Sequence, residues 1–208
     1  MVRPATIPIT EIEHAAFCKT EDELPSKSLA EEMAVNVRWQ GIPTEYLHLE
    51  VEDLDWRIHQ ARQHLGSSVT VLGHHYQREE VIKYADFQGD SFLLSQEAAT
   101  QTSADYIVFC GVHFMAETAG ILCAPHQKVI LPNITAGCSM ADMAPMEDVD
   151  DAWDDLQGVL GDHGGIAPIT YMNSIAGIKA LCGRNGGAVC TSSNAAAVVE
   201  WGFQNSQR

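Results

Sequence analysis

Short apolar runs alternate with longer helical patterns along most of this chain, and this alternation constrains the fold more than any other feature. The runs are rich in β-branched residues and too short for helices, which is typical of buried strands. They lie at residues 69–72, 106–110, 128–132, 167–171 and 187–190. Strands that alternate with helices form a mostly parallel sheet that is covered on both faces. The sequence therefore predicts an α/β fold of repeated three-layer α/β/α units.

The segments between these runs have the residue spacing of helices. The clearest one begins at Leu54, where Leu54, Ile58, Ala61 and Leu65 follow one another at steps of three and four, and Gly66 predicts its end. Further helical patterns lie near residues 91–101, 115–123, 148–160, 174–182 and 194–201. In the pattern at 148–160, an apolar stripe opposes a run of acidic residues, which we interpret as a solvated face.

The spacing of proline and glycine divides the chain into three parts. Residues 1–46 are polar and irregular, which predicts an N-terminal extension with one short helix near Leu29–Val37. A break in the pattern near 133–146 separates two α/β domains, which we expect over 47–137 and 138–208.

The charge balance and the hydrophobicity pattern exclude several classes of function. Twelve Lys and Arg residues against 28 Asp and Glu residues give a formal net charge of −16, which would repel a phosphate backbone, and no basic patch offsets it. No apolar run has the length of a membrane span, and the first residues lack a secretory signal pattern. We therefore expect a cytoplasmic protein with neither nucleic acid nor membrane as a partner.

Six cysteines, at positions 18, 110, 123, 138, 182 and 190, form no pattern of a zinc knuckle or a compact ferredoxin. Most of them are expected to be small buried residues, and Cys110 ends an apolar run. Cys138 differs because it follows Gly137 and precedes a predicted helix start, where backbone dipoles stabilise a thiolate. Spacing alone leaves three roles open for it: a nucleophile, a metal or cluster ligand, or an inert thiol.

Ligands of parallel α/β sheets bind at the carboxyl ends of the strands, so the residues that follow each strand are candidates for the site. The first strand is followed by His74, His75, Tyr76 and Gln77, a cluster suited to acid–base chemistry, although His75 could point away. Next, Asp90 or Ser91 begins a helix, either as a plain N-cap or as part of an anion site. A metal-dependent hydrolase using His74, His75 and Asp90 is a weak alternative, because no HExxH pattern is present.

The later strands also end in polar residues. Tyr171, Met172 and Asn173 follow the fourth strand, and Thr191, Ser192, Ser193 and Asn194 follow the fifth. The second group either caps a helix or donates hydrogen bonds to an anion. Because these strand ends offer hydroxyl, amide and imidazole groups but almost no Lys or Arg, they predict a pocket in which neutral donors hold a small polar anion.

Six sequence blocks, in order between about residues 50 and 202, closely resemble the quinolinate synthase family, the A protein of NAD biosynthesis. They are HHYQ at 74–77, GDSFLLSQ at 89–96, GVHFMAETA at 111–119, PNITAGCSMAD at 132–142, YMNS at 171–174 and CTSSNA at 190–195. The resemblance implies a transferase-type condensation of iminoaspartate with dihydroxyacetone phosphate to quinolinate, with loss of phosphate and two waters. It also implies an oxygen-sensitive [4Fe-4S] cluster that three cysteines hold, one from each of three similar α/β/α domains, and whose open iron acts as a Lewis acid.

The resemblance also implies roles for particular residues. Cys138 corresponds to the first cluster ligand, and Tyr76 to a tyrosine near the reacting carbons, so that Tyr76 and His74 are the expected catalytic residues. The expected substrate-binding residues are His74, Ser91, Tyr171, Met172, Asn173 and Ser192. Cys190 corresponds to no cluster ligand.

One departure from the family pattern lies at the end of the chain. After Trp201 there is no counterpart of the rest of the second domain, of the third domain or of two cluster cysteines. We therefore expect a C-terminally truncated member with one of three cluster cysteines, which is inactive alone. The alternative is an inactive binding or assembly module, complemented by a separate C-terminal chain.

Overall fold

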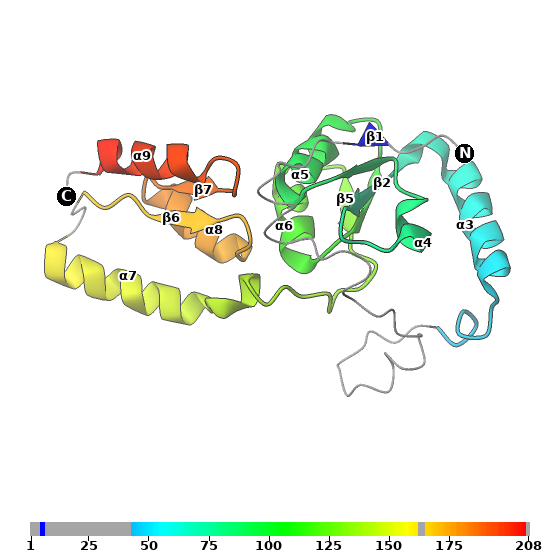
Figure 1. Cartoon of the computed structure of the whole chain (residues 1–208), viewed down its shortest axis with the longest axis horizontal. Helices are drawn as coiled ribbons and strands as arrows, with labels where there is room; N and C mark the ends of the chain where they lie inside the picture. Colours follow the sequence, from blue (N-terminus) through cyan, green and yellow to red (C-terminus); the bar gives the residue numbers. More distant parts are fainter. Residues whose placement is uncertain (1–4, 7–42, 162–164, 207–208) are drawn as a thin grey trace.

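The computed structural model describes residues 5–6, 43–161 and 165–206. Within them the backbone forms two parallel sheets, each flanked by helices (Figure 1). This arrangement confirms the predicted α/β fold with layered α/β/α architecture. The helix expected near Leu29–Val37 lies outside the described residues.

The first sheet has five strands in the order β1-β3-β2-β4-β5, all paired in parallel. Their bounds are β1 Ala5–Thr6, β2 Val69–His74, β3 Phe87–Gly89, β4 Tyr106–Cys110 and β5 Lys128–Ile130. All six residues of β2 are buried, because this strand pairs with β3 on one side and β4 on the other. β1 comes from the segment that we interpreted as an N-terminal extension, and it forms one edge of this sheet.

Helices cover both faces of this sheet, with α5 and α6 on the face toward the second sheet and α3 and α4 on the other (Figure 1). Their bounds are α3 Val51–Leu65, α4 Glu79–Ile82, α5 Ser91–Thr100 and α6 His113–Leu122. Two short 3-10 helices, Gly66–Ser68 and Ala141–Met143, lie in the loops. The hydrophobic core sits between the sheet, α5 and α6, and its largest fully buried residues include Phe109, Leu72, Leu94 and Ile107.

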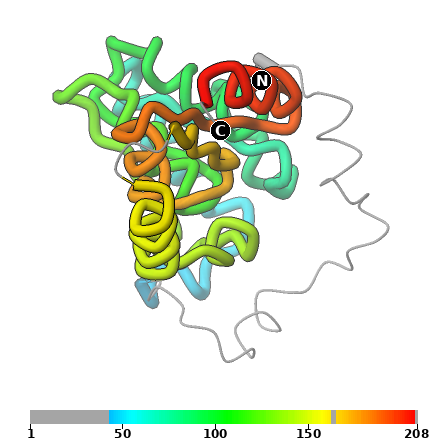
Figure 2. Tube along the Cα trace, turned by 90° about the vertical axis from the view of Figure 1, so that its left-hand side faces the viewer, coloured from blue at the N-terminus to red at the C-terminus, as the bar shows by residue number. Residues whose placement is uncertain are grey.

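The second sheet pairs β6 Ile169–Tyr171 with β7 Ala188–Cys190, in parallel and in register from Ile169↔Ala188 to Tyr171↔Cys190. Three helices surround it: α7 Met146–Leu160, α8 Ala176–Arg184 and α9 Ala195–Asn205. Figures 1 and 2 both place the yellow α7 and the red α9 on opposite sides of this strand pair. The carboxyl end of β6 faces the first sheet across α6, so residues after β6 are close to that unit.

Helix α3 attaches to the fold differently from what its apolar spacing predicts. It ends at Gly66 as expected, but none of its residues is buried. Instead, Lys83 Nζ donates to the two carboxylate oxygens of Asp55 at 2.8 and 2.6 Å, and Arg62 donates to the carbonyl oxygen of Tyr84 at 2.8 Å and pairs with Asp86. Partly buried polar contacts therefore hold α3 against the sheet.

The strand predicted at 69–72 continues through Gly73 and His74, two residues beyond its predicted end. Gly73 is paired on both sides, with Gln88 and Cys110. A Cβ atom at this position would lie 2.7 Å from Ile82 Cδ1 and 2.9 Å from the Ala85 Cβ. Glycine therefore lets the α4 segment pack directly on the strand.

Helix α7 confirms the predicted solvated face. The acidic residues Glu147, Asp148, Asp150, Asp151, Asp154 and Asp155 are all exposed. On the opposite stripe, Val149, Trp153 and Leu160 are half-buried, whereas Leu156 is 45% exposed. The helix therefore packs on α8 through part of its predicted apolar face. Among the described residues, no helix is long and apolar enough to cross a membrane.

The burial of the core of the first unit leads to a prediction about stability. Leu94 on α5 is 0% exposed, whereas Leu122 at the end of α6 is 43% exposed. We expect Leu94→Ala to lower the free energy of unfolding by about 2–5 kcal/mol, because it removes buried methyl groups and leaves a cavity. The matched variant Leu122→Ala should lower it by less than about 1 kcal/mol. Urea unfolding followed by circular dichroism measures both values, and equal losses would contradict this description of the core.

Candidate functional site

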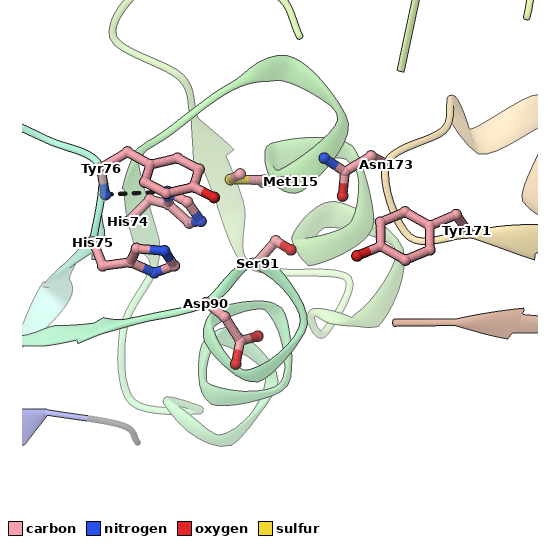
Figure 3. A pocket seen from close by; sticks show the side chains of 8 residues that line it. All are labelled: His74, His75, Tyr76, Asp90, Ser91, Met115, Tyr171 and Asn173. Atoms are coloured by element: carbon pink, nitrogen blue, oxygen red, sulfur yellow. Dashed lines mark hydrogen bonds between the residues drawn. The ribbon is translucent and has the colours of Figure 1, made fainter. Parts of the chain in front are cut away.

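One pocket of the structure lies between the carboxyl ends of strands from both sheets (Figure 3). It is lined by His74, His75, Tyr76, Asp90, Ser91, Met115, Tyr171 and Asn173. His74 ends β2, and His75 and Tyr76 come directly after it; Asp90 and Ser91 follow β3. Met115 comes from the first turn of α6, and the last two residues come from the end of β6 and the loop after it. The structure therefore brings together most of the predicted strand-end residues, as the parallel topology requires.

His74 is the last residue of β2 and is only 4% exposed. The backbone N–H of Tyr76 donates to its Nδ1 at 3.4 Å, so in the neutral ring Nδ1 is the acceptor and the proton is on Nε2. Burial lowers the pKa of His74 to about 3, and the nearby His75 contributes to this shift. His74 is therefore an uncharged hydrogen-bond donor near neutral pH.

The rings of His75 and Tyr76 pack against His74. The ring centroid of His75 lies 4.2 Å from that of His74, and the centroid of Tyr76 lies 4.4 Å away in an edge-on arrangement. Figure 3 shows the Tyr76 hydroxyl directed toward the middle of the pocket, and the side chain is 50% exposed. His75 also reaches the end of β3, since its Nδ1 lies 3.1 Å from the carbonyl oxygen of Gly89. His75 thus connects the carboxyl ends of β2 and β3.

Asp90, rather than Ser91, is the N-cap of α5. Its carboxylate accepts hydrogen bonds from the backbone N–H groups of Phe92 at 2.9 Å and Leu93 at 3.0 Å. These donors are therefore already used by the cap and do not hold an external anion. Ser91 is the first helical residue, and Figure 3 shows its hydroxyl at the centre of the pocket.

The residues after β6 divide between the pocket and the core. Tyr171 and Asn173 point into the pocket, and the Tyr171 hydroxyl is hydrogen-bonded to the hydroxyl of Ser192. Ser192 therefore reaches the site through Tyr171, although its own side chain does not line the pocket. Met172 is 2% exposed and belongs to the hydrophobic core, whereas its two neighbours in the chain, Tyr171 and Asn173, line the pocket. The structure therefore does not place the Met172 side chain at the site.

Cys138 lies half-buried beside this loop, and the Asn173 side-chain amide donates to its sulfur at 3.6 Å. The predicted helix start after Cys138 is wrong: only a one-turn 3-10 helix forms, at Ala141–Met143, and α7 begins later, at Met146. A helix dipole therefore does not act on this sulfur. The Asn173 amide is the polar group that the structure brings to it.

Of the other described cysteines, Cys182 and Cys190 are buried as expected, whereas Cys110 and Cys123 are half-buried. Burial raises the pKa of the thiols of Cys123, Cys182 and Cys190, and it raises that of Cys110 to about 11. Over the described ranges, no three His, Cys, Asp or Glu side chains are grouped so that they could hold a metal ion. His74, His75 and Asp90 in particular do not form the metal site of the hydrolase alternative, because the Asp90 carboxylate caps α5 instead.

Met115 is a pocket residue that sequence reasoning missed. It is 3% exposed, and its side chain lies between the Tyr76 and Asn173 side chains in Figure 3. In the sequence, Met115 looks like an ordinary core residue, because it stands in a predicted apolar helix. The available signal was its position, since it stands in the first turn after β4, at another strand end.

Comparison with known proteins gives one consistent family. The sequence model of the family described as "Quinolinate synthetase A protein" matches residues 56–208. The quinolinate synthase of Corynebacterium glutamicum is 53% identical over 171 residues, which is 82% of this chain and 43% of the relative. The proteins of the same name from Nocardioides sp. and Geobacillus sp. are 60% and 51% identical, over 71% and 85% of this chain and 37% and 47% of theirs.

The chain thus spans less than half the length of these curated relatives. The matched region includes every described strand-end residue of the pocket, from His74 to Asn173, and Ser192 behind it. With identities of 50% or more over most of its length, the chain belongs to the quinolinate synthetase A protein family.

Proposed function

We propose that this chain supplies the described pocket to a quinolinate synthase, which condenses iminoaspartate with dihydroxyacetone phosphate to quinolinate, phosphate and two waters. The observation that carries the proposal is the convergence of neutral hydrogen-bond donors from both sheets on one cavity, with Cys138 beside it. The name shared by the relatives supports the same activity. Because a three-carbon unit passes from dihydroxyacetone phosphate to iminoaspartate, we assign the reaction to the transferases and place it in cytoplasmic NAD biosynthesis.

In this proposal, neutral side chains hold an anionic substrate. His74 donates from Nε2, Ser91 and Tyr171 donate hydroxyl groups, and Asn173 offers its amide. Among the described residues that line the pocket there is no Lys or Arg, so in this proposal binding depends on hydrogen-bond geometry rather than on an ion pair. The half-exposed Tyr76 hydroxyl is the group best placed to move a proton at the reacting carbons.

The family resemblance adds a [4Fe-4S] cluster, and Cys138 fits one of its thiolate ligands. Its sulfur is half-buried, lies next to a pocket residue and already accepts a hydrogen bond. When bound, such a cluster supplies a Lewis acid to the substrate. The described residues offer no set of three ligands, so in this proposal the remaining ligands come from outside them. The pocket side chains bind and orient the substrate.

The first prediction concerns Tyr171 and Asn173. With quinolinate as the probe in isothermal titration calorimetry, we expect Tyr171→Phe and Asn173→Ala each to weaken binding about three- to tenfold, since each removes one hydrogen-bonding group. Tyr46→Phe is the matched control, because Tyr46 is 41% exposed and lies outside the pocket, and it should bind as the parent chain does. A parent chain that binds no quinolinate would contradict the proposed function itself.

The second prediction concerns the uncharged state of His74. Its pKa of about 3 in the folded chain lies below the ordinary 6.5, so between these values the unfolded chain takes up a proton that the folded chain does not. The free energy of unfolding should therefore fall as the pH falls through this window, by at most about 1.4 kcal/mol per pH unit, with no contribution from His74 above it. We expect His74→Gln to reduce this slope and the exposed control His126→Gln to leave it unchanged. Urea unfolding at several pH values measures the slope, and identical slopes for all three chains would refute the assignment.

The third prediction concerns access to Cys138, which a cluster ligand requires. With iodoacetamide at mildly alkaline pH, we expect Cys138 to be modified before Cys110, Cys182 and Cys190, as read from peptide masses over time. For Cys110, a pKa of about 11 instead of 9.0 lowers the thiolate fraction about a hundredfold. Cys190→Ser should leave the labelling of Cys138 unchanged. Faster modification of Cys190 than of Cys138 would contradict the access that this role requires of Cys138.

A further inference from the structure

A polar junction between α6 and α8 lies outside the pocket, and none of its residues lines the site. Glu117 on α6 accepts a hydrogen bond at its Oε2 from the backbone N–H of Ala176, at 3.0 Å. Ala176 is the first residue of α8, and the N-cap residue Ile175 has no side-chain acceptor of its own. The first turn of a helix leaves backbone donors unsatisfied and attracts negative charge. A carboxylate from the first unit thus caps a helix of the second.

Lys179 makes the second contact of this junction. It lies one turn into α8, and its Nζ donates to the carbonyl oxygen of Ser174 at 2.5 Å. The same ammonium lies 5.4 Å from the centre of the Phe114 ring, which belongs to α6. Burial lowers the pKa of Lys179 to about 8, while the nearby Glu117 carboxylate opposes this shift. A partly buried cation is therefore kept between the two helices.

Ser174 links this junction to the pocket. It is 6% exposed, and its hydroxyl donates to the carbonyl oxygen of Tyr171 at 2.8 Å, while its backbone N–H donates to that of Met172 at 2.9 Å. The loop that presents Tyr171 and Asn173 is thus held on one side by Ser174 and Lys179. Beyond Ser174, the chain runs directly into α8, the helix that Glu117 caps.

We propose that Glu117 and Lys179 are positioning residues, which fix the loop Tyr171–Asn173 against α6 and so set the spacing between the two halves of the pocket. Helix α6 also contributes Met115 to the pocket, two residues before Glu117. The same helix therefore lines one side of the pocket and, through Glu117, holds the segment that lines the other side. Neither positioning residue lines the pocket itself. The identity of the ligand in this inference rests on the proposed function.

Three variants test this role. Glu117→Ala removes both the charge and the acceptor, Glu117→Gln keeps an acceptor oxygen for the Ala176 N–H, and Lys179→Met removes the donor to Ser174 with little change in length. Glu200→Ala on the exposed face of α9 is the matched control. The measurements on each folded chain are hydrogen exchange of the peptide that spans residues 172–178 and the affinity for quinolinate as the probe.

We expect Glu117→Ala to increase exchange in this peptide and to weaken quinolinate binding, each by about five- to tenfold, the usual effect of losing a helix cap. Glu117→Gln should restore most of both values, Lys179→Met should raise exchange and weaken binding in the same direction, and Glu200→Ala should change neither. A loss of global stability alone would not produce rescue by glutamine together with exchange confined to this loop.

Three other outcomes would each contradict either this proposal or the proposed function. Unchanged exchange in both Glu117→Ala and Lys179→Met would show that these residues do not hold the loop. Faster exchange with unchanged quinolinate affinity would show that the junction does not position the site. A parent chain that binds no quinolinate would overturn the proposed function instead, and hydrogen exchange would still decide whether Glu117 and Lys179 hold the loop.

Discussion

Pairing of β2 on both edges is the constraint on which the rest of the first unit depends. Because neighbouring strands satisfy its backbone on each side and helices cover its faces, all six of its residues are buried, including the polar Thr70 and His74. The carboxyl end of β2 is consequently a fixed point, and His74 stands there with little access to water. The low pKa of His74 follows from this placement, since burial penalises the charged imidazole.

The site is built from two units that share few connections. The first unit provides His74, Tyr76 and Ser91 on rigid strand and helix ends, and the second provides Tyr171 and Asn173 on one short loop. The distance between these groups depends on the contacts between the units. They include the Asn173 amide on the Cys138 sulfur, Met172 in the hydrophobic core, and the hydrogen bond from the start of α8 to Glu117. Small changes at those contacts are therefore transmitted to the pocket, because a displacement of about one ångström alters hydrogen-bond geometry substantially.

Sequence patterns predicted the elements whose periodicity is strong and missed those without one. The run at 106–110 and the helix that ends before Gly66 were predicted with nearly the observed bounds, whereas the strand Phe87–Gly89 was missed because three residues with one apolar side chain carry no pattern. In the site, the rule that ligands meet strand ends located the right loops. It could not assign individual side chains. Met172 points into the core and Met115 into the pocket, and these directions depend on the path of the loop and on helix phase rather than on residue type.

The charge of the chain also affects how the pocket can work. A net charge of −16 repels anionic ligands at long range, and the described residues of the pocket include no Lys or Arg side chain to offset it. A cation buried in such a site would have a large desolvation penalty unless paired, whereas neutral imidazole, hydroxyl and amide donors have a much smaller one. For the proposed anionic substrate, affinity would then come from several hydrogen bonds that are satisfied together, each of which contributes about 1 kcal/mol. A site of this kind discriminates by the placement of donors, so the relative position of its two halves matters more than the strength of any single group.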